Sequence, residues 1–169
     1  MVRPIVKYGD PVLGRPAVEI TEFDASLKSL ADEMLEVMYA ARGVGLAAPQ
    51  IGVSKRIFVM DATAGQDQAR RFVVANPVIE LAEGEQEGGE GCLSVPGFSF
   101  EIRRAEHVVL RGQDVGGSQI ILDVAGLEAR CVAHEIDHLN GKLLLAHVSP
   151  LKRDLTIRKI KKRIRAHDW

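Results

Sequence analysis

The alternation of apolar and polar residues first becomes regular after Asp24, where apolar positions recur every three or four residues. They are Leu27, Leu30, Ala31, Met34, Leu35 and Met38. This spacing places them on one face of a helix. Asp24 can accept hydrogen bonds from the first free amides of that helix, and Gly43 is a typical C-terminal stop. The pattern therefore predicts a helix that Asp24 caps and that ends near Arg42.

Short runs rich in β-branched and aromatic residues occupy the middle of the chain and predict strands. They lie at residues 56–61, 72–81, 107–111 and 119–124. Pro77 interrupts the second run, and the turn residues 114–117 predict a hairpin between the last two. Glycine-rich segments separate these runs. We expect residues 43–50 to form no regular element and the acidic residues 82–91 to form a mobile surface loop.

Two further helices are predicted near the end of the chain, over residues 126–140 and 154–166. Strands in the middle, with helices before and after them, indicate the α+β class. The chain has 169 residues, 46% of them hydrophobic, which is an ordinary globular composition. We expect residues 1–169 to form a single domain with its own core.

The formal net charge of −1 hides an uneven distribution. Residues 152–169 hold eight Lys or Arg and two Asp, a balance of +6, against fourteen Lys or Arg and twenty-one Asp or Glu elsewhere, a balance of −7. No apolar run approaches the roughly 20 residues of a membrane span, and the N-terminus does not resemble a secretory signal. Two cysteines are too few for a secreted disulfide scaffold. We expect a cytoplasmic protein without a membrane partner.

Residues 134–138 read His-Glu-Ile-Asp-His, an H-E-x-x-H pattern. Residues four apart lie on one face of a helix, so His134 and His138 can chelate one metal ion. Glu135 projects beside them and can accept a proton from water, as the general base of a hydrolase does. The alternative is a core helix with two incidental histidines, because a five-residue pattern also arises by chance.

A hydrolytic metal ion needs a third protein ligand and an open position for water. One zinc-peptidase completion requires His where this chain has Leu144, and another requires a later Glu, which is absent after Glu135. Asp154 and His147 are weak candidates. Cys92, in the sequence Glu-Gly-Cys-Leu-Ser, is another, because a thiolate is a strong ligand for divalent metals. It could equally be a small buried side chain.

The segment 43–50 reads Gly-Val-Gly-Leu-Ala-Ala-Pro-Gln. Gly43 and Gly45 leave room for a ligand or another strand to pass close to the backbone. Gln50 offers an uncharged donor that could stabilise a developing oxyanion. The alternative is a helix stop followed by a tight loop.

In this order, the segments G-V-G-L-A-A-P-Q, E-G-C-L-S and H-E-I-D-H-L-N-G resemble the signature of the peptide deformylase family. The resemblance extends over essentially the whole chain. It implies mostly antiparallel sheets around a central helix that carries H-E-x-x-H, with an N-terminal and a C-terminal helix. It also implies an enzyme that removes the N-formyl group from N-formylmethionyl nascent peptides and releases formate.

The resemblance further implies roles for individual residues. The ligands of one divalent metal ion would be Cys92, His134 and His138. Fe²⁺ is typical of the family, and Zn²⁺, Ni²⁺ or Co²⁺ can replace it. Glu135 would act as general base and then as general acid. The metal, the side chain of Gln50 and the backbone N–H of Leu93 would hold the oxyanion.

A methionine side chain requires an apolar and adaptable pocket. The candidates to line it are Gly43, Val44, Gly45, Leu127 and Cys131. Leu127 and Cys131 lie seven and three residues before His134, so they share the metal-facing side of the helix, although plain core positions are the alternative. The chain departs from the family at Ala133, often Gln, and at residues 97–100, which lack an Arg that some relatives carry.

The basic segment at 152–169 forms a predicted helix with one apolar stripe, made of Ile157, Ile160 and Ile164. One hypothesis, suggested by the family resemblance, is that this helix docks on the ribosome near the nascent-chain exit. The alternative is a solvated helix held by its isoleucines. Binding to DNA is not expected.

Two other functions stay open for the H-E-x-x-H helix: a zinc metallopeptidase, or a protein in which the metal is purely structural. Glu135 argues against a structural metal, because a closed site needs no carboxylate beside its water. Asp137 could orient a ligand or pair with Arg104, or it could be solvated.

Overall fold

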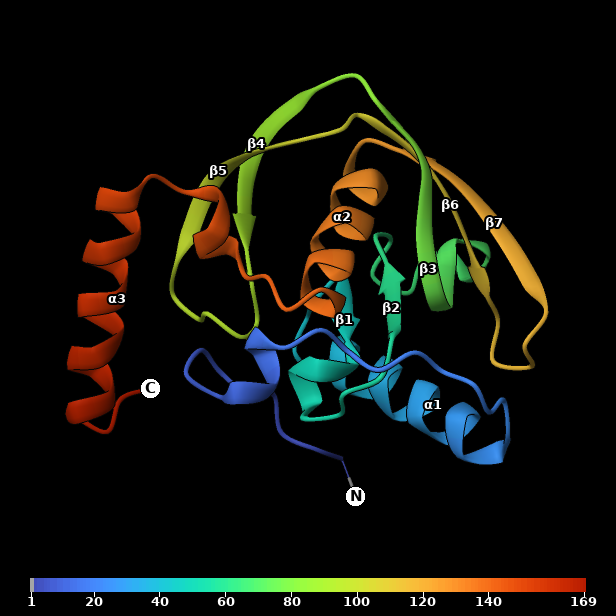
Figure 1. Cartoon of the computed structure of the whole chain (residues 1–169), viewed down its shortest axis with the longest axis horizontal. Coiled ribbons are helices and arrows are strands. Elements are labelled where there is room, and N and C mark those ends of the chain that lie inside the picture. Colours follow the sequence, from blue (N-terminus) through green and yellow to red (C-terminus); the bar gives the residue numbers. More distant parts are fainter. Residues whose placement is uncertain (1) are drawn as a thin grey trace.

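The computed structural model describes residues 2–169 and has two antiparallel sheets with a helix between them (Figure 1). The larger sheet has the order β1-β2-β3-β6-β7, with bounds Gly45–Ala47, Ile57–Asp61, Arg71–Glu83, His107–Gln113 and Gln119–Ala125. The smaller sheet pairs β4 (Gln86–Gly91) with β5 (Ser99–Arg104). The helices are α1 (Ala25–Ala40), α2 (Leu127–Leu139) and α3 (Pro150–Arg165). The predicted α+β class is confirmed.

The two sheets are joined by short connections that arch over α2 (Figure 1). Only Gly84 and Glu85 separate β3 from β4, and only Ala105 and Glu106 separate β5 from β6. Because β3 pairs with β6 and β4 with β5, one long ladder bends at this point and continues on the other side of the helix. Helix α2 is therefore enclosed by both sheets.

Helix α1 forms as its apolar spacing predicts. The Asp24 carboxylate accepts hydrogen bonds from the backbone N–H groups of Ser26 and Leu27, and Met34 and Met38 are fully buried. The helix ends at Ala40, slightly before the predicted stop. Arg42 then adopts a left-handed backbone conformation with φ of 56°. This turn sends the chain into β1.

The prediction that residues 43–50 form no regular element was wrong. Gly45 to Ala47 make strand β1, and Ala48–Ile51 form a short 3₁₀ helix. Gly45 lies opposite Met60 of β2, and a Cβ atom at Gly45 would lie 2.5 Å from Oε1 of Glu135. Glycine is therefore required because the strand edge passes directly against the α2 carboxylate, which local sequence patterns do not reveal.

The prediction of a mobile surface loop at 82–91 was also wrong. Residues 86–91 form β4, in which Gly88 and Gly89 pair with Ile102 and Glu101 of β5. Strand β5, which the apolar pattern did not indicate, alternates exposed and buried positions, with Phe100, Ile102 and Arg104 buried. Glycine weakens an isolated strand, but long-range pairing compensates here.

The remaining strand predictions are confirmed with small shifts. Strands β2 and β3 cover the predicted runs, and the pairing of β3 with β6 changes register between Ala75 and Val78, around Pro77. Strands β6 and β7 form the predicted hairpin. Proline has no N–H to donate to the ladder, so a register shift is the expected consequence.

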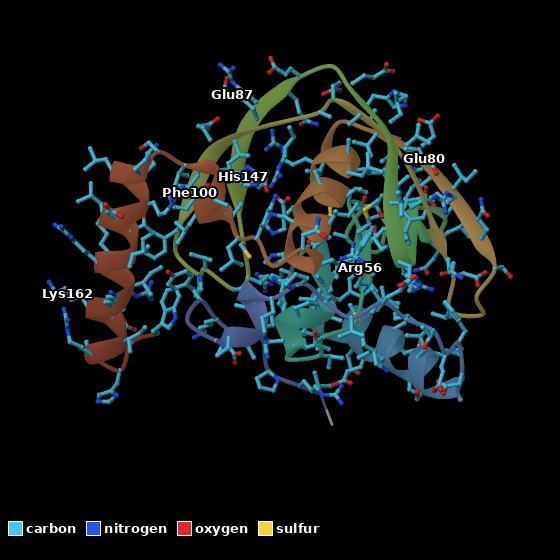
Figure 2. All side chains as sticks on the ribbon, viewed as in Figure 1. Arg56, Glu80, Glu87, Phe100, His147 and Lys162 are labelled. Atoms are coloured by element: carbon cyan, nitrogen blue, oxygen red, sulfur yellow. The ribbon has the colours of Figure 1, made fainter. Side chains whose placement is uncertain are left out.

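Helix α3 begins four residues earlier than predicted. The Ser149 side chain accepts a hydrogen bond from the Lys152 N–H, and Pro150 occupies the first turn. Ile160 is fully buried, whereas 45% of Ile164 is exposed. The apolar stripe of α3 therefore packs against the rest of the protein only in part. Figure 2 shows Lys162 extending from the outer side of this helix. Within residues 2–169, no helix has the length and apolarity needed to cross a membrane.

Candidate active site

Helix α2 places the two histidines of the H-E-x-x-H pattern on its buried face. The Nε2 atoms of His134 and His138 are 3.1 Å apart, and Sγ of Cys92 lies 3.3 Å from Nε2 of His138. The three possible ligand atoms all lie within 4.8 Å of one another. Cys92 directly follows β4, the strand that the sequence had predicted to be a loop. The position of β4 therefore places the Cys92 thiol beside α2.

The other candidates for a third ligand lie elsewhere. His147 contacts Asp137 through Nε2 at 2.6 Å and does not belong to the group of possible ligands. Asp154 is exposed on α3, and Leu144 is buried in the apolar cluster beneath that helix. Among the described residues, only Cys92 joins the two histidines.

The donor set fits a divalent metal ion. Nδ1 of His134 lies 2.7 Å from Oε1 of Glu90, and donation from Nδ1 leaves the Nε2 lone pair free to face Cys92 and His138. One thiolate and two imidazoles suit several first-row metals, and three protein ligands leave a position open for water. Burial lowers the pKa of His138 well below its ordinary value, which favours the neutral, ligating form.

Glu90 is the centre of a buried charge network that sequence reasoning missed. Its carboxylate contacts the guanidinium of Arg104 at 2.6 Å, that of Arg130 at 2.7 Å and the His134 ring. Burial opposes ionisation, but hydrogen bonds from His134 and Arg104 hold the pKa of Glu90 well below its usual range. Arg130 precedes His134 by four residues, a spacing that could have suggested it.

Arg104 extends this network to the surface. Its guanidinium also contacts Asp137 at 2.8 Å, which is the pairing that the sequence suggested. Asp137 in turn contacts His147, which Figure 2 places beside β5. Ligand His134 is therefore oriented by Glu90, and Glu90 is held by charges on β5 and α2.

Glu135 has the properties of a general base. Its side chain is 3% exposed, and Oε2 has no hydrogen-bond partner within residues 2–169. Burial raises the pKa of Glu135 to about 7. A carboxylate with a pKa near neutrality can both accept and return a proton at physiological pH.

Gln50 is oriented with its amide N–H toward the possible metal ligands. Its Oε1 accepts a hydrogen bond from the Ala47 N–H at 2.9 Å, which turns Nε2 toward Sγ of Cys92 at 3.7 Å and Oγ of Ser94 at 3.3 Å. The side chain is 1% exposed. Gln50 therefore presents a fixed neutral donor beside the thiol.

A cavity of about 500 Å³ opens beside these groups. All the residues expected to bind substrate line it, namely Gly43, Val44, Gly45, Leu127 and Cys131, together with Gln50 and Leu93. Leu127 is 53% exposed, so it is not a core residue. The sequence did not indicate the wall formed by Pro96, Gly97 and Phe98, nor Arg42 at the same cavity.

Comparisons with known proteins show which family the chain resembles over its length. A family model described as polypeptide deformylase matches residues 2–154. The chain is 48% identical to a peptide deformylase of Acidobacterium capsulatum, covering 100% of this chain and 99% of the relative. A crystal structure of a peptide deformylase from Legionella pneumophila superposes with a TM-score of 0.91 at 44% identity, covering 99% of this chain and 98% of the other. The corresponding Thermus thermophilus structure gives 0.88 at 44% identity, covering 99% and 98%.

Proposed function

The chain belongs to the peptide deformylase family, and on that premise we propose which of its residues carry the reaction. It is a metal-dependent hydrolase that removes the N-formyl group from the N-terminal formylmethionine of nascent peptides. The proposal rests above all on one observation: Cys92, His134 and His138 converge beside the buried Glu135, at the edge of one cavity.

We propose that Cys92, His134 and His138 hold one divalent metal ion, Fe²⁺, with Zn²⁺, Ni²⁺ or Co²⁺ as possible replacements. The mixed thiolate and imidazole set supports this assignment, because such ligands suit these metals. When bound, the metal would polarise the formyl oxygen and lower the pKa of a water molecule. Glu90 keeps the His134 ring in position throughout.

Glu135 takes the proton from the attacking water and then passes it to the leaving amine, so that formate and a free N-terminus are released. Its burial, its raised pKa and its unpartnered Oε2 support this role. Gln50, through Nε2, and Leu93, through its backbone N–H, stabilise the negative charge that develops on the formyl oxygen. The fixed orientation of the Gln50 amide supports its part.

The apolar side of the cavity binds the methionine side chain. Val44 and Leu127 leave 39% and 53% of their surface exposed there, and Cys131 lies beneath them with Sγ 3.5 Å from the Val44 carbonyl. Exposed apolar residues around a concave site are typical of ligand pockets. An apolar wall separates side chains differing by one methylene by only about 1–3 kcal/mol, so near-isosteres of methionine should be accepted in part.

One assay distinguishes the proposed function from its rivals. The purified protein is loaded with Fe²⁺ without oxygen and given formyl-Met-Ala-Ser, and formate release is followed. Glu135→Ala should bind the metal but lose about 10²–10⁴-fold in turnover, which is the usual contribution of a general base. For the wild-type protein, cleavage of internal peptide bonds would indicate a metallopeptidase, and the absence of any turnover would indicate a structural metal.

We also propose that residues 1–169 act as a single cytoplasmic domain that docks on the ribosome through α3. The exposed cations Arg158, Lys159 and Lys162 support this, because basic helices bind RNA through its phosphates. Lys159→Glu combined with Lys162→Glu should reduce co-sedimentation with ribosomes at low salt while leaving formate release unchanged. Undiminished co-sedimentation would contradict the docking proposal.

A further inference from the structure

The wall of the cavity at Pro96, Gly97 and Phe98 is supported from outside by the far end of α3. The wall is packed only in part by other contacts: Pro96 and Phe98 are partly buried, Phe98 against the apolar cluster beneath α3, and Gly97 is exposed. A local turn precedes it, with the Val95 N–H donating to the Cys92 carbonyl at 3.0 Å. What holds the wall on its outer side therefore matters for the shape of the cavity.

Arg163 of α3 reaches this wall directly. Its Nη1 donates a hydrogen bond to the Pro96 carbonyl at 3.2 Å. Gly97 has φ of +84°, and a Cβ atom there would lie 3.1 Å from the same Nη1, so the guanidinium occupies the space where another residue would place its side chain. The Nε of Arg163 donates to the Asp168 carbonyl at 3.0 Å, which ties the helix end to the following residues.

Trp169 makes the second contact. Its ring packs against Phe98 with centroids 6.4 Å apart and an interplanar angle of 59°, and the Arg163 guanidinium lies 5.3 Å from the centre of the indole. The indole N–H donates to the Tyr8 carbonyl at 3.1 Å. The Tyr8 N–H in turn donates to the Ser94 carbonyl at 2.8 Å. Trp169 is thus fixed both to the cavity wall and to a segment bound beside Cys92.

We propose that Arg163 and Trp169 are positioning residues that hold the Pro96–Gly97–Phe98 wall in the shape that binds the formyl peptide. The inference rests on the proposed function, because it takes the cavity as the peptide site. Neither residue lines the cavity, so both act through the wall. The wall contributes no metal ligand or proton donor, so it should affect peptide binding equally in the ground state and in the transition state.

A wall that binds the ground state and the transition state equally well should affect KM and leave kcat nearly unchanged. With formyl-Met-Ala-Ser, Arg163→Ala and Trp169→Ala should raise KM about threefold to tenfold, the range expected for losing one aromatic or cation–π contact, with kcat within about twofold. Trp169→Phe, which keeps a ring, should recover most of the wild-type KM. The matched control is Arg165→Ala, which removes the same charge from the same helix at an exposed position.

The tryptophan provides an independent readout, because Trp169 is the only one in the chain. Titration with the product peptide Met-Ala-Ser should change the indole emission of the wild type and of Arg165→Ala, and change it much less in Arg163→Ala. Unchanged KM in both variants, or an equal rise in Arg165→Ala, would overturn the proposal. So would a loss of kcat in step with thermal stability, which indicates a purely structural role. Failure of the wild type to release formate would instead overturn the proposed function.

Discussion

Helix α2 has one side packed against the large sheet and another facing β4 and β5, and the two sides are built differently. Toward the large sheet it buries Val132 and Leu139 among apolar residues such as Phe58 and Leu110. Toward the small sheet it presents Arg130 and His134, which meet Glu90. One side is held by apolar burial and the other by ion pairs.

The difference separates two tasks within one helix. Apolar packing is not directional, so it fixes the position of the helix but tolerates small changes in side-chain orientation. A metal ligand must be oriented within much narrower limits, and charged hydrogen bonds supply that direction. The directional side is also the more vulnerable one, because removing one partner of a buried ion pair leaves an unpaired charge out of water.

The largest expected effect is on the charged side. Glu90→Ala should lower the free energy of unfolding by about 3–5 kcal/mol, because Arg104 and Arg130 lose their shared partner, and should weaken metal binding about 10–100-fold. Urea unfolding and titration of the metal-free protein with Co²⁺ measure the two quantities. Glu87→Ala on the same strand is the control, because the one ion pair of Glu87 within residues 2–169 is an exposed pair with Arg103. Equal losses in both variants would contradict the comparison.

A smaller effect is expected on the apolar side. Leu139→Ala should lower the free energy of unfolding by about 2–5 kcal/mol, because Leu139 is fully buried and truncation leaves a cavity. Unlike Glu90→Ala, it should leave the affinity of the folded protein for Co²⁺ nearly unchanged. Leu151→Ala, at a position that is 70% exposed, is the control for stability. If Leu139→Ala weakened metal binding as much as Glu90→Ala, the division of tasks would be wrong.

The smallest effect concerns an exposed charge cluster on the large sheet. His107 lies 2.7 Å from Glu83 and 2.6 Å from Asp123, and the hydrogen bonds that its ring donates to these carboxylates raise its pKa. A group whose pKa is raised in the folded state stabilises the protein. This stabilisation is fully present when the pH is below the unfolded-state pKa of about 6.5, and it is lost as the pH rises through the folded-state pKa. The urea midpoint of His107→Gln should therefore fall below that of the wild type more at pH 5.5 than at pH 9. A difference independent of pH would argue against this linkage.

Short-range sequence patterns determined several helices and strands of this protein and the spacing of two candidate metal ligands. The apolar spacing and the Asp24 cap define α1, and the runs rich in β-branched and aromatic residues define β2 and the β6–β7 hairpin. The four-residue interval of His134 and His138 places two candidate ligands on one helix face. These features depend on residues that are neighbours along the chain, so helical and strand periodicity is sufficient to predict them.

Tertiary structure alone decided the rest. Glycine-rich β4 exists because β5 pairs with it, and that pairing brings Cys92 to His138 and buries Glu90 between two arginines. The contact of Trp169 with Phe98 likewise joins segments far apart in sequence. No local pattern encodes these contacts, because their free energy comes from burial and pairing that exist only once the chain has folded.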